Sequence, residues 1–111
     1  MYYPYNTPVK TYLNNKNKEL FEAILSCNTA QDIANFCRDL MTKDEIEEFV
    51  KRFEIAKRLN AGESQRTISK SMEVSITTVT RVNLWLKRGM NGYKTVLSNL
   101  SHHHKPQSIG L

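Results

Sequence analysis

The sequence predicts an all-α protein of about six helices, with a helix-turn-helix at residues 64–87. Three observations lead to this fold class. Apolar residues recur at spacings of three and four, as they do on the buried face of a helix. Side chains that cap helix N-termini stand just before these apolar runs. No segment alternates polar and apolar residues with the period of two that is typical of a half-buried strand.

Length and composition fit one small domain. The chain has 111 residues, of which 40% are hydrophobic and 24% charged, as in ordinary globular proteins. A domain this short buries a thin core and often gains stability by dimerising. No apolar run reaches the roughly 18 residues of a membrane span, and no secretory signal is recognisable, so a cytoplasmic protein is expected.

The first helices follow an N-terminal arm at residues 1–14, where Pro4 and Pro8 oppose helix formation. One helix is expected from about Lys16 to Cys27, and a second after the N-cap Thr29. The apolar side chains expected on their buried faces are Leu20, Phe21, Ile24, Leu25, Ile33, Phe36, Cys37 and Leu40. The two cysteines are interpreted as a buried, reduced pair. No C-x-x-C or neighbouring His pair indicates a metal site.

The third helix has the clearest start. Thr42 and Glu45 have the spacing of a capping box, and Gly62 is expected to end the helix. Its apolar stripe consists of Ile46, Phe49, Val50, Phe53, Ala56 and Leu59. The sequence therefore predicts one long amphipathic helix between residues 43 and 61.

Two short helices come next. Ser64 is expected to cap a helix ending near Met72, and Ser75 to cap a helix from Ile76 to about Lys87. Glu73 stands where such turns often carry a glycine in left-handed conformation, which costs another residue about 1 kcal/mol. A last helix is expected from Asn91 to Leu100. The folded domain would then span residues 15–100, and residues 101–111, with three histidines, are expected to form a disordered tail.

The charge distribution points to a polyanionic partner. Residues 61–111 carry seven Lys or Arg and two Glu, a net charge of +5, whereas residues 1–60 carry nine of each sign. A basic half of this kind attracts nucleic acid, although it is also compatible with a merely solvated surface.

The two short helices offer side chains suited to reading DNA. Helices joined by three residues must pack their inner faces, and Ile68, Met72, Val74, Val79 and Leu86 have the required offsets. The hydroxyl and cationic side chains on the outer side can then meet base edges and phosphates. The residues expected to contact DNA are Gln65, Arg66, Ser69, Ile76, Thr77, Thr80 and Lys87.

These features predict a sequence-specific, double-stranded DNA-binding transcriptional regulator. The alternative is a helical, dimeric protein-interaction module that binds no DNA. The run I-T-T-V-T-R, with its three threonines, has poor intrinsic helix propensity for the surface of a bundle, which favours DNA binding. No Cys–His pair, paired carboxylates or glycine-rich phosphate loop indicates an enzyme.

From Leu40 to Leu100 the sequence resembles the Trp repressor superfamily. The resemblance rests on L-M-T-K-D-E at the start of the third helix, Arg52 within that helix, G-E-S-Q-R entering the motif and I-T-T-V-T-R in its second helix. The ending G-M-N-G-Y-K-T-V-L is similar to the YerC/YecD branch. The resemblance implies an intertwined homodimer whose two recognition helices enter successive major grooves of a roughly palindromic operator. It also implies a repressor function.

The resemblance also implies a pocket for L-tryptophan. The positions that match its ligand-contacting residues are Thr42, Arg52, Thr78 and Arg81. Two further matching positions carry larger residues: Val82 replaces a glycine and Trp85 a serine. We therefore expect the pocket to be closed, so that DNA binding would not require L-tryptophan; L-tryptophan as a bound corepressor is the alternative.

Overall fold

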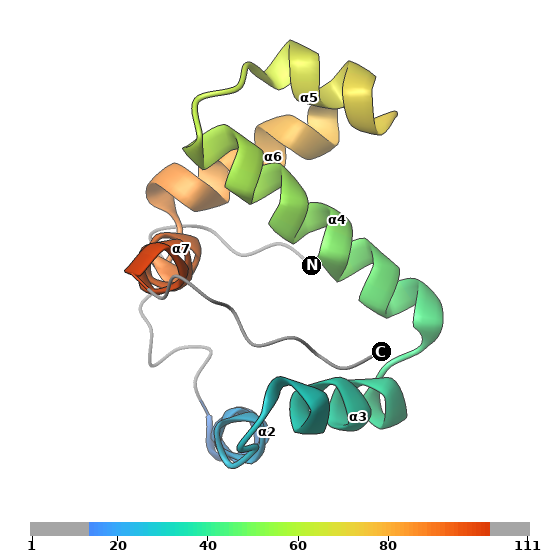
Figure 1. Ribbon diagram of the computed structural model, residues 1–111, viewed down its shortest axis with the longest axis vertical. Helices are drawn as coiled ribbons and strands as arrows, with labels where there is room; N and C mark the ends of the chain where they lie inside the picture. Colours follow the sequence, from blue (N-terminus) through green and yellow to red (C-terminus); the bar gives the residue numbers. More distant parts are fainter. Residues whose placement is uncertain (1–13, 103–111) are drawn as a thin grey trace.

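Six helices account for all the regular secondary structure between residues 14 and 102, the part of the chain that the computed structural model describes (Figure 1). They are α2 (Asn15–Leu25), α3 (Ala30–Leu40), α4 (Lys43–Asn60), α5 (Gln65–Met72), α6 (Ile76–Arg88) and α7 (Gly92–His102). The all-α prediction is confirmed. Most of the expected arm at residues 1–14, and residues 103–111 of the expected tail, lie outside the described residues.

Short polar side chains begin the helices. Thr29, Thr42, Ser64 and Ser75 each accept a hydrogen bond from the backbone N–H three residues on, as the sequence predicts. The capping box is present, since the Glu45 carboxylate also accepts from the Thr42 N–H at 2.8 Å. The predicted helix starts are therefore confirmed for α3 to α6.

Helix ends agree less well with the sequence. Helix α2 ends at Leu25, not Cys27, because the Cys27 N–H donates to the Ile24 carbonyl, three residues back rather than four, at 3.1 Å. Helix α7 continues through Ser101 and His102, the first two residues of the expected tail. Gly62, at φ +98°, follows the end of α4 as predicted. No described helix has the length and apolar character needed to cross a membrane.

The core lies where α4, α5 and α6 meet. Its fully buried cluster consists of Ile55, Ala56, Ile68, Val79 and Val82, with Leu59, Met72, Val74, Trp85 and Tyr93 packed around it. Figure 1 shows α6 crossing behind the upper part of α4, with α5 over their junction and α7 beside them. Burial of Ile68 and Val79 is expected from the sequence, whereas Ile55 lies outside the predicted apolar stripe.

The expected burial of α2, α3 and the first half of α4 is wrong for a single chain. Neither α2 nor α3 contains a fully buried residue. Ile33 is 38% exposed, Leu40 47% and Val50 60%. The cysteines are only half-buried. The reason is that α2 and α3 lie apart from the α4–α7 cluster and join it through the α3–α4 connection (Figure 1).

An open apolar groove follows from this arrangement. It has a volume of about 410 Å³ and runs between the end of α3 and the stretch of α4 from Ile46 to Lys57. Its lining residues are Cys37, Met41, Ile46, Phe49, Val50, Phe53, Glu54 and Lys57. The apolar stripe predicted for α4 is therefore two surfaces, a covered one near Ala56 and an uncovered one near Phe49.

Candidate nucleic-acid interface

The turn between α5 and α6 is held by its own backbone and one side chain. Glu73 has φ 55° and ψ 46°, the left-handed conformation that the sequence analysis expected at this position. The Val74 N–H donates to the Ser69 carbonyl at 3.1 Å, and the Ser69 hydroxyl donates to the Val74 carbonyl at 2.6 Å. The second contact offsets part of the cost of placing a non-glycine residue there.

Ser69 is consequently less available to a ligand than the sequence suggested. Its side chain is half-buried in the crossing of the helices, and its single hydroxyl proton is used within the turn. A serine hydroxyl has only one proton to donate. The structure therefore gives Ser69 a role in fixing the angle between α5 and α6.

The expected DNA-contacting residues Gln65 and Thr80 meet on the outer side of the two helices. The Thr80 hydroxyl donates to the Gln65 side-chain oxygen at 2.8 Å, across fifteen residues of sequence. Arg66 follows Gln65 and is exposed. Thr77 and Lys87 lie one turn before and two turns after Thr80, on the same face of α6. Both are exposed, and Ile76 is 49% exposed.

A clamp near the end of α4 holds the connection to α5 and the last turn of α5. The Arg58 Nε lies 3.0 Å from both Glu63 carboxylate oxygens, and its Nη2 lies 2.6 Å from Oε1. The Arg58 Nη1 also donates to the Ser71 hydroxyl on α5 at 2.9 Å. The hydrogen bond to Arg58 lowers the pKa of Glu63, and the same contact raises the pKa of Arg58. Partial desolvation opposes both shifts.

No local sequence pattern predicts this clamp. Arg58 and Glu63 are five residues apart across a helix end, so they match no intrahelical pairing of three or four residues. Only the turn at Gly62 brings them together. Glu63 is one of the two acidic residues after position 60. Because Arg58 neutralises its charge, Glu63 does not weaken the positive potential around the cationic side chains of α5 and α6.

Of the residues expected to form a ligand pocket, Thr42 lies apart from Arg52 within one chain. Thr42 caps the start of α4, about 15 Å along the helix axis from Arg52. The Arg52 Nε lies 3.6 Å from the Glu48 carboxylate, and its guanidinium lies 5.4 Å from the Phe49 ring centroid. The first half of α4 therefore engages Arg52 locally.

The α6 members of this set have different environments. The Thr78 hydroxyl contacts the capping Ser75 hydroxyl at 2.9 Å, whereas Arg81 is exposed. Val82 is 1% exposed within the core, and Trp85 packs against that core. A glycine at position 82 would leave room between α4 and α6 that the valine side chain fills.

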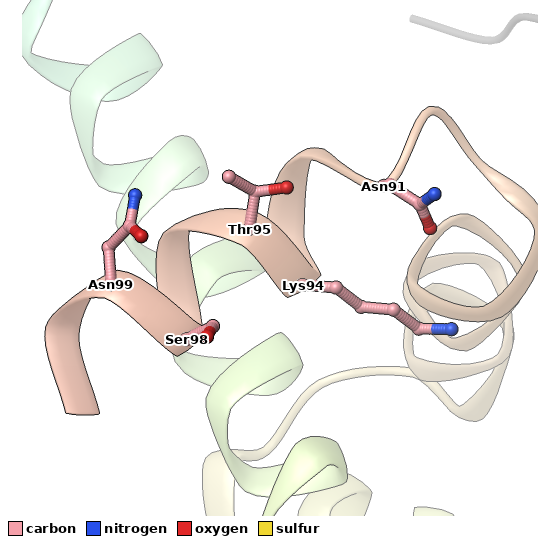
Figure 2. Close-up of a pocket in the computed structure, with 5 residues that line it drawn as sticks. All are labelled: Asn91, Lys94, Thr95, Ser98 and Asn99. Atoms are coloured by element: carbon pink, nitrogen blue, oxygen red, sulfur yellow. The ribbon is translucent and has the colours of Figure 1, made fainter. Parts of the chain in front are cut away.

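Helix α7 carries a separate polar hollow of about 440 Å³. Figure 2 shows its five lining side chains, Asn91, Lys94, Thr95, Ser98 and Asn99. Asn91 precedes the helix and has φ 64°. None of the residues predicted to contact DNA or a ligand lines this hollow. Within residues 14–102, no three His, Cys, Asp or Glu side chains are grouped as metal ligands.

Comparisons with known proteins agree with the earlier resemblance and widen it. Residues 15–101 match the family model of the Trp repressor protein. YerC of Bacillus subtilis (strain 168), named as an uncharacterized protein, is 30% identical over 82 residues, which are 74% of this chain and 79% of YerC.

Two solved structures share the fold. The crystal structure of a TrpR like protein from Eubacterium eligens ATCC 27750 matches with a TM-score of 0.76 and 32% identity, covering 83% of this chain and 95% of that one. A structure from Staphylococcus aureus matches with a TM-score of 0.77 and 27% identity, covering 86% and 95%.

The Arg58–Glu63 clamp predicts how stability depends on pH. Because the pKa of Glu63 is lowered in the folded chain, the contribution of the clamp is complete at neutral pH. It is lost as pH falls below the ordinary glutamate value of 4.5 and through the lowered pKa. Glu63→Gln should reduce this acid dependence in urea unfolding measured from about pH 3 to 7. Glu47→Gln, an exposed glutamate of α4, is the matched control; equal pH profiles for the two variants would contradict the prediction.

Proposed function

The chain belongs to the Trp repressor family, and from this premise we propose that it is a sequence-specific regulator of transcription that binds double-stranded DNA. It acts as a dimeric repressor and reads a roughly palindromic operator through the major groove. It is not an enzyme, because Trp repressor proteins are transcription regulators.

The proposal rests on the polar and cationic side chains that the outer side of α5 and α6 exposes. Gln65 and Thr80 are joined there at 2.8 Å, with Arg66 exposed beside Gln65 and Lys87 two turns along from Thr80. Uncharged hydroxyl and amide groups suit base edges, and the flanking cations suit phosphates. Because Ile68 and Val79 are fully buried beneath the two helices, these groups are presented in a fixed arrangement.

The uncovered apolar surface of the single chain supports the dimer in this proposal. The apolar side chains left open on α2, α3 and the first half of α4, among them Leu25 at 82% and Val50 at 60% exposed, need a cover. In the dimer, α2 and α3 of one protomer pack on the α3–α4 groove of its partner. The two copies of α6 then enter successive major grooves about 34 Å apart.

The same apolar surface favours the alternative function. A helical adaptor that dimerises or binds a protein partner would use α2–α4 and would leave α5 and α6 without a DNA ligand. Such a module has no reason to bind duplex DNA with strong salt dependence, so affinity for DNA separates the two functions.

The core argues against control by L-tryptophan. Val82 is buried between α4 and α6, and Trp85 packs beside it. We therefore propose that packing, rather than a bound amino acid, holds α6 in its DNA-reading position. Thr42, Arg52, Thr78 and Arg81 retain the residue types of a ligand site without requiring a cofactor.

DNA binding is expected to depend on the exposed cations. The logarithm of affinity should fall linearly with the logarithm of salt concentration, because each neutralised phosphate releases counterions. Arg66→Ala and Lys87→Ala should each weaken binding to all duplexes and reduce the salt slope by about 1, whereas Thr77→Ala should mainly relax base specificity. Lys43→Ala, on the end of α4 far from α5, is the control. Absence of salt-sensitive duplex binding would favour the adaptor function.

Dimerisation is expected to depend on the uncovered part of α4. Val50→Asp should shift sedimentation equilibrium at micromolar concentrations toward monomer, because a carboxylate replaces an apolar contact. Ile76→Asp introduces the same charge on an exposed apolar residue of α6 and should leave the dimer intact. A monomeric wild-type protein, or the same effect from both variants, would contradict the proposed interface.

L-tryptophan should produce no saturable heat in isothermal titration and no change in operator affinity. The physical reason is that the Val82 side chain already occupies the space between α4 and α6. The assay uses the dimer, since Thr42 and Arg52 lie about 15 Å apart along α4 within one chain. Saturable binding in the micromolar range would show that the core opens to admit the amino acid and would contradict the closed pocket.

A further inference from the structure

The hydrogen bond between Thr80 and Gln65 restricts what each side chain can offer to DNA. The Thr80 hydroxyl gives its proton to the Gln65 side-chain oxygen at 2.8 Å. A threonine hydroxyl has one proton and two acceptor lone pairs, and a glutamine amide has one oxygen and an NH₂ group with two protons. With this bond formed, Thr80 offers an acceptor, and the NH₂ group of Gln65 offers donors.

The bond joins two positions that the fold already holds. Gln65 is the first residue of α5, directly after the capping Ser64 and one turn before the fully buried Ile68. Thr80 follows the fully buried Val79 on α6. Because both backbones are anchored, forming the contact costs mainly the freedom of the two side chains.

This direction of the bond suits a phosphate at the start of α5. The N-terminus of α5 carries a partial positive charge, and Arg66 adds a full one. Phosphates approach helix N-termini of this kind. A Gln65 amide that turns its oxygen toward Thr80 leaves its NH₂ group available to a phosphate, which is an acceptor only.

The restriction selects one recognition mode for Thr80. Glutamine can read adenine by accepting from N6 and donating to N7, but here Thr80 already uses one of the two lone pairs of the Gln65 oxygen. Thr80, in turn, can only accept from a base edge. In the major groove, the hydrogen-bond donors are the exocyclic amines of cytosine and adenine.

We propose that Gln65 and Thr80 act as one reading unit, in which Gln65 orients the Thr80 hydroxyl to accept from the exocyclic amine of cytosine or adenine. The Gln65 amide donates at the same time to a backbone phosphate. Gln65 is thus a positioning residue for base specificity at a base that it does not touch. This inference rests on the proposed function, because it names the base class that the DNA-binding surface selects.

The neighbouring threonines have different tasks. Thr78 spends its hydroxyl on the cap formed by Ser75, at 2.9 Å. Thr77 is exposed on the same face as Thr80, and its side chain makes no hydrogen bond to another described residue. The hydroxyl of Thr77 therefore keeps both donor and acceptor character, which makes this residue the matched control for Thr80.

The experiment selects bound sequences from a random duplex library and then measures affinities for duplexes that differ at single positions. The wild type should prefer cytosine or adenine at one position of each half-site. Thr80→Val, which keeps the shape and removes the hydroxyl, should abolish that preference at that position. The expected loss of discrimination is about two- to tenfold, the effect of one hydrogen bond.

Two substitutions of Gln65 separate its two tasks. Gln65→Ala removes the acceptor, so that the Thr80 hydroxyl regains its choice of direction and the preference at that position should relax. Gln65→Glu keeps an acceptor for Thr80 but loses the outward donor and repels phosphate. It should therefore weaken binding to every duplex while it retains the preference for cytosine or adenine. Thr77→Val combined with Gln65→Ala should give independent, multiplicative effects.

The outcomes distinguish this inference from the function on which it rests. If Gln65→Ala weakens all duplexes equally and leaves each base preference unchanged, the reading unit is overturned while DNA binding stands. A wild-type preference for guanine or thymine at the position that Thr80→Val alters has the same consequence. If the wild type binds no duplex in a salt-dependent manner, both the proposed function and this inference fall. Thermal unfolding of each variant verifies that these surface changes leave the fold intact.

Discussion

The packing of Ile55 and Ala56 on α4 against Val79 and Val82 on α6 determines most of what this chain can present to a ligand. With Ile68 from α5, these residues form the fully buried cluster of the protein. Each buried branched side chain contributes about 1.5–3 kcal/mol, and the three helices have no other common anchor of that size among the described residues. The angle of α5 and α6, the closed space beside Val82 and the outward direction of Thr80 all depend on this junction.

A core this small leaves a large part of the apolar surface unsatisfied. Helices α2 and α3 contain no fully buried residue, and the groove beside Phe49 is open. The chain thus divides its apolar residues between a junction that orders α4–α6 and a surface that requires a cover. Under the proposed function, this division separates two tasks: the junction shapes the DNA-reading side, and the open surface joins two such sides at a fixed spacing.

Serine and threonine hydroxyls have several different roles in this short segment. Ser69 holds the turn, Ser75 and Thr78 form a cap, and Thr80 is directed by Gln65. Each group has one proton, so its use inside the fold determines what remains for a partner. The threonine-rich start of α6, unfavourable on helix propensity alone, is thereby compatible with a well-anchored helix.

The sequence by itself determined the helices and the starts of most of them. Capping by Thr29, Thr42, Ser64 and Ser75 is a local interaction over three residues, so its pattern can be read directly. The left-handed Glu73 followed in the same way from the length of the turn, and the family followed from motifs of fixed spacing. Only the tertiary structure decided which apolar faces are covered, because periodicity marks a face without showing whether anything packs on it.

The tertiary structure also decided the use of individual polar side chains. Arg58 meets Glu63 and Ser71 through the turn at Gly62, and Thr80 meets Gln65 across fifteen residues. Neither contact corresponds to a helical spacing, so no local pattern could predict it. The sequence identified Gln65 and Thr80 as separate candidates for contacting DNA. Their partnership exists because the buried contacts of Ile68 and Val79 bring two helices to one crossing angle.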